Sequence, residues 1–423
     1  MITIHHLLKT SKTFFILWCM IAAFGTYFCM YAFRKPFING IYPEITIGAL
    51  NYKAVLIIAQ VIGYMTSKFV GIKVISELQA TDRKKLIIGL IFIAEFALLF
   101  FGLIPPPFNL ALLFFNGLPL GMVWGIIFSY LEGRRFTEIL SIGLSISLII
   151  SSGIIKTIYF TVQAWMPFVS EFWLPALIGL LFLPLFLMCV WMLSIIPNPT
   201  SEDKLLRIER LPMTHTDKIT SLNTYGLGII TLGLIYMMLT TMRDFRDNFS
   251  VEIWHEIDIN WNRSVFALTE TITAVIVLIA IGSLSLIRNK VQGFWATLSL
   301  IALGLLISGV STLCYHYGII NSFLWMLFIG MGMFLAYTPI QVVVFDRMIA
   351  LFKMKANAGF FIYICDSFGY LGSVGLLLYK EFFAKDLSWM KVLMQFSYIL
   401  TISCILLLIL SACFFTRKLR SQR

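Results

Sequence analysis

The sequence contains few charged residues. Of its 423 residues, 13% are Asp, Glu, Lys or Arg, whereas 59% are hydrophobic. Soluble globular domains carry about 25% charged residues, so this composition excludes an ordinary soluble enzyme or binding domain. The longest stretch between apolar runs, residues 198–223, is also too short to fold as a separate soluble domain.

Histidine and cysteine are scarce where they could do chemistry. The five histidines lie at the termini, in loops or at the ends of apolar runs, which gives little support to a histidine proton relay. The seven cysteines form no Cys-x-x-Cys pair, and most lie inside apolar runs, where cysteine behaves as a small hydrophobe. We expect no metal site, disulfide or cofactor. A membrane enzyme is disfavoured, because no paired His/Asp or His/Glu motif lies near a membrane face.

Long apolar runs fill most of the chain. Each has about 20 residues, enough to span roughly 30 Å of hydrocarbon as a helix. No small-residue cleavage site follows the first run, so we expect it to be retained as a transmembrane helix. The runs predict an all-α integral membrane protein with twelve transmembrane helices, near residues 12–34, 52–75, 86–104, 108–130, 137–163, 172–196, 224–245, 264–287, 293–317, 321–345, 357–380 and 391–416.

A charged, proline-containing stretch divides these helices six and six. We expect an N-terminal six-helix bundle over residues 1–197, a cytoplasmic linker over 198–223 and a C-terminal bundle over 224–423. With the N-terminus inside, most of the 32 basic residues fall on the inner side, which is the positive-inside pattern. This predicts a multi-pass protein of the plasma (inner) membrane with both termini cytoplasmic. The basic residues are spread over many short loops, which argues against a nucleic-acid partner.

Ionisable residues inside apolar runs mark candidate functional sites, because a charge in hydrocarbon costs several kcal/mol. Arg34 ends the first run and shares one helical face with Tyr27 and Tyr31. Arg34 is either an anchor at the membrane edge or part of a binding site, and Lys35 beside it is interpreted as an edge anchor. Arg243 lies at a similar depth in the first helix of the second half. Two arginines at matched depth in parallel repeats suit a dianionic substrate on the axis between the repeats.

Other buried charges add to this set. Lys68 and Lys156 lie well inside their runs, whereas Lys380 is expected in an outer loop. Arg243 and Asp247 are four residues apart and could neutralise each other, and Glu270 could pair with Arg243 between helices. A buried acid either pairs with a cation or takes up a proton. The candidates for gating or proton coupling are Glu95, Arg246, Asp247, Glu270 and Asp366.

Glycine spacing indicates close helix packing. "GYLGSVG" places Gly369, Gly372 and Gly375 near one helix face, and "GMVWG" does the same for Gly121 and Gly125. Small faces let helices approach and slide. Such faces are expected both in ordinary helix packing and in two bundles that rock against each other.

Several stretches resemble one transporter family in collinear order. "YFCMYAFRKPF" resembles a tyrosine-rich helix 1 that ends in Arg-Lys-x-Phe, and "GYMTSKFVG" resembles a Ser-Lys-Phe segment of helix 2. "GMVWG", "YMMLTTMRDF", "LTETITAV" and "FGYLGSV" resemble segments of helices 4, 7, 8 and 11. The family is the organophosphate:phosphate antiporter branch of the major facilitator superfamily, which includes glycerol-3-phosphate and hexose-phosphate exchangers.

The resemblance implies roles for matching positions. Arg34 and Arg243 would bind the substrate phosphate, and Lys68 would add positive potential. Tyr27 and Tyr31 would line the cavity. Glu270 would pair with a cation as part of the gate.

The sequence also departs from that family. Its histidine in helix 5 has no counterpart here, where the segment offers Ser151, Ser152 and Lys156. The superfamily's Gly-x-x-x-Asp-Arg signature reads "GIKVISE" after helix 2, with Ile75 in place of the acid. The gate chemistry and the substrate could therefore differ.

The sequence therefore predicts a secondary transporter that moves a small organic anion by alternating access, with an organophosphate exchanged for phosphate as the first candidate. The same-class alternative is proton-coupled symport of an organic anion through Glu95, Glu270 or Asp366. A transporter-like sensor that binds its solute without moving it would need the same site. The expected partners are the anionic solute and membrane lipid, and the protein is expected to work as a monomer.

Overall fold

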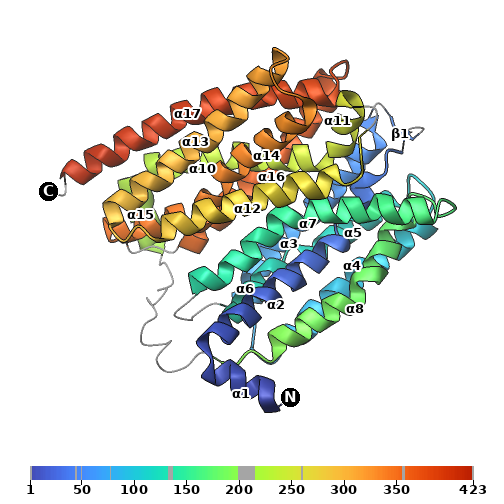
Figure 1. Ribbon diagram of the computed structural model, residues 1–423, viewed down its shortest axis with the longest axis horizontal. Coiled ribbons are helices and arrows are strands. Elements are labelled where there is room, and N and C mark those ends of the chain that lie inside the picture. Colours follow the sequence, from blue (N-terminus) through green and yellow to red (C-terminus); the bar gives the residue numbers. More distant parts are fainter. Residues whose placement is uncertain are drawn as a thin grey trace. The chain divides into compact units, whose positions relative to one another are not determined.

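The computed structural model describes residues 2–42, 45–48, 50–76, 78–131, 137–198, 215–258, 261–354 and 358–421. Figure 1 shows that these residues are almost entirely helical, apart from one two-stranded hairpin. The hairpin pairs β1 (Thr46–Ile47) with β2 (Leu50–Asn51). In hydrocarbon every backbone polar group must be satisfied within the chain, which long apolar helices achieve.

The structure has two compact units. Unit 1 comprises Met1–Ile208 with Asn262–Leu268, and unit 2 comprises Glu209–Trp261 with Thr269–Arg423. The N-terminal part of the chain, which includes most of unit 1, contains α1 (Ile2–Thr10), α2 (Lys12–Ala32), the 3-10 helix η1 (Pro36–Asn39), α3 (Tyr52–Ser76), α4 (Arg83–Leu103), α5 (Leu110–Leu120), α6 (Val123–Leu131), α7 (Thr137–Trp165) and α8 (Leu174–Ser194).

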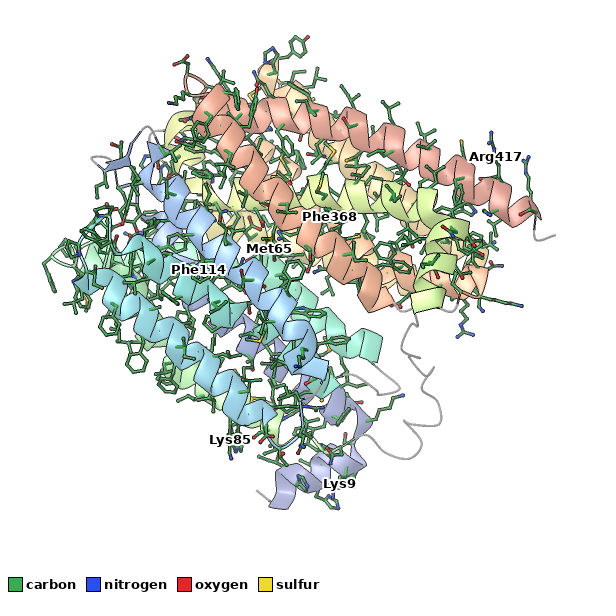
Figure 2. All side chains as sticks on the ribbon, turned by 180° about the vertical axis from the view of Figure 1, so that it is seen from behind. Lys9, Met65, Lys85, Phe114, Phe368 and Arg417 are labelled. Carbon is green, nitrogen blue, oxygen red and sulfur yellow. The ribbon has the colours of Figure 1, made fainter. Side chains whose placement is uncertain are left out.

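In unit 1, α2 packs against α7 and α8, α3 against α5, and α4 against α5 and α8. Figure 2 labels Lys9 and Lys85 at the same end of this unit. At the start of α2, the Ser11 hydroxyl accepts a hydrogen bond from the amide of Phe14 and caps the helix.

The C-terminal part of the chain contains α10 (His215–Asn248), α11 (Ser250–Ile257), α12 (Val265–Ser285), α13 (Lys290–His316), α14 (Ser322–Pro339), the π-helix η2 (Ile340–Val344), α15 (Phe345–Phe352), α16 (Ala358–Phe383) and α17 (Trp389–Ser421). In unit 2, α10 packs against α16 and α17, and α13 packs against α14 and α17 (Figure 1). Helices α14, η2 and α15 follow one another without a break.

Eleven described helical segments are long and apolar enough to cross a membrane. The twelfth predicted span corresponds to α16, a helix of 26 residues. The prediction of an all-α, twelve-helix membrane protein is confirmed at the level of the fold.

Three details differ from the sequence prediction. Helix α10 begins at His215, inside the stretch predicted as linker, and residues 199–214 of that stretch lie outside the described residues. Lys380 is not in an outer loop, because it lies in α16 with its Nζ 4.6 Å from the centre of the Trp389 ring. Lys35 is not an exposed anchor, because it is 6% exposed.

Two helix crossings bring backbones into direct contact. A Cβ atom at Gly117 of α5 would overlap the carbonyl oxygen of Gln60 in α3, and one at Gly63 would overlap that of Phe114. Met65 and Phe114 mark these neighbouring helices in Figure 2. In unit 2, a Cβ at Gly304 of α13 would lie 2.5 Å from the carbonyl oxygen of Gly332 in α14. Glycine is required at these crossings because backbone atoms cannot move aside as a side chain can.

Candidate functional site

Arg34 follows the C-terminal end of α2 and is buried. The residue is 8% exposed, and its amide donates to the carbonyl of Tyr31 at 3.1 Å. An arginine that anchors a helix at the membrane edge would extend into water. Burial therefore favours the binding-site interpretation over the edge anchor.

Two buried amide side chains hold the end of α2. Gln60 of α3 donates to the carbonyl of Arg34 at 2.8 Å and to Asn116 of α5 at 2.7 Å. Asn116 donates to the carbonyl of Phe33 at 2.9 Å. The last carbonyls of a helix lack partners within the helix, so these amides satisfy them and fix the backbone beside Arg34. Sequence reasoning missed both amides, which occur singly in apolar runs.

Arg34 and Lys68 meet at one aromatic ring. The Cζ of Arg34 lies 3.9 Å from the centre of the Tyr64 ring, and Nζ of Lys68 lies 5.6 Å from the same centre. Tyr64 is 2% exposed, and cation–π attraction is strongest where water is excluded. The structure thus brings together two of the cations predicted from sequence, through a tyrosine that the prediction did not include.

Tyr27 and Tyr31 are buried in an edge-to-face pair, with ring centres 5.6 Å apart. Both rings therefore lie in the interior of unit 1. Lys156 of α7 is 3% exposed, and its Nζ lies 6.0 Å from the centre of the Phe266 ring within unit 1.

Unit 1 buries more positive than negative charge. Arg34, Lys35, Lys53 and Lys156 are buried, and among the described residues of this unit the buried acid is Glu95. Lys53, at the start of α3, is 1% exposed and was missed, because its position beside a loop resembles that of an interfacial lysine. Most of the buried ionisable side chains in the described part of this unit are therefore cationic.

The segment after Arg34 is fixed by Glu171. One oxygen of Glu171 accepts from the amide of Ile41 at 3.1 Å and from that of Tyr42 at 3.4 Å. The Tyr42 hydroxyl donates to the carbonyl of Phe37 at 3.0 Å. Burial, with the nearby charge of Glu171, raises the pKa of Tyr42 well above its usual value, so this phenol stays neutral. These hydrogen bonds therefore fix the backbone of the segment after Arg34, from Phe37 to Tyr42.

Glu95 of α4 lies against Gly179 of α8, close to the ring of Phe33. It is 3% exposed, and within the described part of the chain neither carboxylate oxygen has a hydrogen-bond partner. Among the described residues Glu95 therefore has no partner cation, and its role in proton coupling stays a prediction.

In unit 2, Arg243 is the centre of a polar network. Its Nη2 lies 2.8 Å from Oδ1 of Asp244, and its Nη1 donates to the Tyr337 hydroxyl of α14. The other oxygen of Asp244 accepts from the Ser373 hydroxyl of α16 at 2.9 Å. The arginine predicted from sequence is thus held by α10, α14 and α16 together.

The network continues to Asp366. The hydroxyls of Tyr337 and Tyr236 are 2.9 Å apart, and Tyr236 donates to Oδ1 of Asp366 at 2.5 Å. Arginine can only donate, so the Tyr337 hydroxyl accepts a hydrogen bond from Arg243. Because the Tyr236 hydroxyl donates to Asp366, the Tyr337 hydroxyl donates the hydrogen bond to Tyr236. The hydrogen bonds therefore run in one direction, from Arg243 through two tyrosines to Asp366.

Glu270 pairs with Arg246. The sequence had suggested a pair between Glu270 and Arg243, so that prediction is wrong. Nη1 of Arg246 lies 2.7 Å from Oε1 of Glu270, and Nη2 of Arg246 donates to the carbonyl of Met326 at 3.1 Å. The Arg246 and Glu270 side chains are 6% and 13% exposed. Similarly, the ion pair described for Arg243 is with Asp244, whereas the sequence suggested Asp247.

Breaking the Arg246–Glu270 pair is expected to destabilise the protein strongly. Arg246→Met leaves the carboxylate of Glu270 without its cation, which costs about 3–5 kcal/mol in buried pairs. The double variant Arg246→Met/Glu270→Leu removes both charges and should recover most of that loss. Thermal unfolding of the purified protein in detergent measures both. A double variant as unstable as Arg246→Met would contradict the interpretation as a desolvated pair.

No metal site emerges from the part of the chain that the structure describes, where no group of three or more His, Cys, Asp or Glu side chains could hold an ion.

A π-helix lies close in sequence to Tyr337. The π-helix η2 begins right after Pro339, two residues beyond Tyr337. Such turns inside helices are frequent at functional sites.

Comparisons with known proteins agree with the fold. A family model described as "Family of unknown function (DUF5690)" matches residues 36–418. No curated protein matches the chain. Similar solved structures include a bacterial homologue of the human drug peptide transporters PepT1 and PepT2, with a TM-score of 0.63, 11% identity and coverage of 97% of this chain and 100% of that one.

Two further structures have the same fold. The D-xylose-proton symporter gives a TM-score of 0.58 at 15% identity, covering 92% of this chain and 96% of the symporter. The nucleoside transporter NupG gives 0.59 at 12% identity, covering 95% and 98%. The chain therefore has the fold of major facilitator transporters, and identities this low establish the fold alone.

Proposed function

Because the chain belongs to the DUF5690 family of unknown function, we propose an activity from its own residues: it is a secondary transporter for a small organic anion. The observation that carries this proposal is the buried positive charge of unit 1, where Arg34, Lys35, Lys53 and Lys156 are all 8% exposed or less. Cationic side chains buried among apolar helices are candidate binding groups, because an anionic solute is attracted to positive charge in a low-dielectric interior.

The fold supports transport over catalysis. The similar structures are a peptide transporter homologue, a sugar–proton symporter and a nucleoside transporter. Transporters of this fold work by alternating access. We infer a multi-pass protein of the plasma membrane that carries out the same kind of cycle.

An organic phosphate is the first substrate class to test. Arg34 and Arg243 correspond to the two phosphate-binding arginines implied by the resemblance to organophosphate exchangers. Guanidinium groups match phosphate oxygens with paired hydrogen bonds. Lys68 adds a cation beside Arg34, because both lie over the ring of Tyr64.

Proton-coupled symport of an organic anion is the second candidate mode. The hydrogen-bonded path from Arg243 through Tyr337 and Tyr236 to Asp366 favours it, because it connects a cation with a carboxyl group that can take up a proton. The sequence analysis did not predict this path, because its residues lie on three different helices.

Reconstituted vesicles separate the two modes. Vesicles loaded with labelled phosphate should release it when glycerol 3-phosphate or a hexose phosphate is added outside, if the protein is an exchanger. A symporter should instead take up labelled organophosphate into phosphate-free vesicles when an inward proton gradient is imposed. Flux at the level of empty vesicles in both assays, with folded protein, would refute transport of these anions. Binding without flux would favour a sensor.

A further inference from the structure

Helix α14 changes its geometry at Pro339, close to the Arg243 network. Proline has no amide hydrogen, so it cannot donate to the carbonyl one turn before it. The amide of Ile340 donates to the carbonyl of Tyr337, and the π-helix η2 begins at Ile340. Four of the five residues of η2 are β-branched (Ile340 and Val342–Val344), and such residues have a reduced helix propensity. The sequence therefore favours irregular backbone directly after the tyrosine that contacts Arg243.

Two polar atoms of this segment are buried without hydrogen-bond partners. Within the described part of the chain, neither Oγ1 of Thr338 nor Oε1 of Gln341 forms a hydrogen bond, and Thr338 is 5% exposed. Similar side chains elsewhere do find partners. Thr240 and Thr241 of α10 donate to carbonyls one turn earlier, at 2.8 and 2.9 Å, and Gln60 of α3 donates to two oxygen atoms. Buried polar atoms are almost always paired, so an unpaired one needs an explanation, and a bound ligand is one.

Gln341 lies on the same side of its helix as Tyr337. The two residues are four positions apart, which is close to one helical turn and places their Cβ atoms about 5–6 Å from each other. The Tyr337 hydroxyl accepts a hydrogen bond from Nη1 of Arg243, and η2 contacts α10, the helix that carries Arg243. Ile340 and Val344 at the two ends of η2 are buried, whereas Gln341 is partly exposed. Gln341 therefore lies one turn along the helix from a residue that binds the guanidinium.

The chemistry of an amide carbonyl limits what Gln341 can recognise. A carbonyl oxygen only accepts, so its ligand must donate, as a hydroxyl or an ammonium group does. An ammonium group close to Arg243 would be repelled by the like charge. A phosphate or carboxylate offers only acceptors and pairs with the guanidinium instead. An anion with a hydroxyl on its carbon chain supplies an acceptor for Arg243 and a donor for Gln341.

We propose that Gln341 is a specificity residue of the anion site at Arg243, and that its carbonyl oxygen accepts a hydrogen bond from a hydroxyl on the carbon chain of the substrate. This inference rests on the proposed function, because it requires an anion that binds at Arg243. It narrows the substrate class to hydroxylated organic anions. A site built to pair with a hydroxyl rejects an analogue that lacks it, because the polar group of the site is then left unpaired.

The test compares two ligands of the same charge. Glycerol 3-phosphate and propyl phosphate share the phosphate and a three-carbon chain, but propyl phosphate has no hydroxyl. Calorimetric titration of the purified full-length protein in detergent, at one pH, gives both affinities. The wild type should bind glycerol 3-phosphate at least about tenfold more tightly, which corresponds to one net hydrogen bond.

Gln341→Met should remove this preference. Methionine keeps the length of the side chain, and its sulfur is only a weak acceptor. The affinity for glycerol 3-phosphate should fall about tenfold, to the level of propyl phosphate, while the affinity for propyl phosphate stays within about twofold of the wild type. A loss of folding or of the anion site would instead weaken both ligands together, so the ratio of the two affinities separates recognition from structure.

Three other variants complete the test. Gln341→Asn keeps the amide on a shorter side chain and should retain an intermediate preference, which serves if Gln341→Met does not fold. Gln292→Met makes the matched change at an exposed glutamine of α13 and should behave as the wild type. Thr338→Val removes the other unpaired atom and should leave most of the preference intact. A preference lost in Thr338→Val and kept in Gln341→Met would overturn the assignment to Gln341.

The remaining outcomes separate this inference from the proposed function. Equal binding of glycerol 3-phosphate and propyl phosphate by the wild type would overturn the inference and leave anion binding intact. A preference that persists unchanged in Gln341→Met would show that another group reads the hydroxyl. If neither ligand nor inorganic phosphate binds to folded wild-type protein, the proposed function fails for these anions, and the inference fails with it.

Discussion

Replacing Arg34 or Arg243 with alanine should abolish anion transport. Each guanidinium is largely buried, and truncating one partner of a buried charged contact costs about 2–5 kcal/mol, or roughly 30-fold to several thousand-fold in affinity. Arg34→Ala should also leave Lys68 as the remaining cation over the Tyr64 ring, which does not provide paired hydrogen bonds. Binding by calorimetry and flux in vesicles measure the loss.

Conservative and distant variants separate lost binding from lost folding. Arg34→Lys and Arg243→Lys keep the charge and should retain partial binding, because lysine lacks the planar fork of donors. Lys85→Ala in α4 and Lys391→Ala in α17 remove exposed cations from units 1 and 2 and should behave as wild type. A folded Arg34→Ala protein with normal affinity would show that Arg34 is structural and no ligand.

Gly117→Leu should prevent stable folding of unit 1. Its side chain would have to occupy the space of the Gln60 backbone carbonyl, and α3 and α5 could stay together only by moving apart. Such a shift would also displace Gln60 and Asn116, which hold the end of α2 beside Arg34. We expect little monodisperse protein on gel filtration in detergent, and a melting temperature lower by well over 10 °C for any that remains, in line with overpacking costs of several kcal/mol.

Gly89→Leu is the matched control for this prediction. Gly89 lies in α4 of the same unit, and a Cβ at that position would meet nothing within 4 Å. Leucine there also raises helix propensity relative to glycine. A Gly117→Leu protein as stable as Gly89→Leu would contradict direct backbone contact between α3 and α5.

Glycine spacing in the sequence predicted close contacts only in part. Gly369 and Gly372 face Thr240 and Thr241 of α10, as a small helix face would, whereas a Cβ at Gly375 would meet open space. Gly117, which meets a backbone carbonyl, lies four residues before Gly121 and continues that spacing, whereas Gly304 lies in a run that the spacing did not single out. Spacing defines a face of one helix, but the identity of the atoms opposite depends on a second helix far away in the sequence.

Sequence spacing was also an incomplete guide to the ion pairs. Spacing along α10 suggested Arg243 with Asp247, yet the structure pairs Arg243 with its neighbour Asp244. Adjacent residues on a helix point in different directions, so a rule of four-residue spacing does not anticipate this contact. The long arginine side chain reaches Asp244 while Tyr337 on α14 occupies another donor.

By itself, the sequence determined the helical membrane fold and the shortlist of buried charges. Both follow from local chemistry, since apolar runs of sufficient length become spanning helices and charges within them are costly. The tertiary structure alone decided that Arg34 and Lys68 share the Tyr64 ring, that Gln60 and Asn116 hold the end of α2, and that Arg243 connects with Asp366 through two tyrosines. Those contacts join residues on different helices, and their geometry depends on helix crossings that no single stretch of sequence encodes.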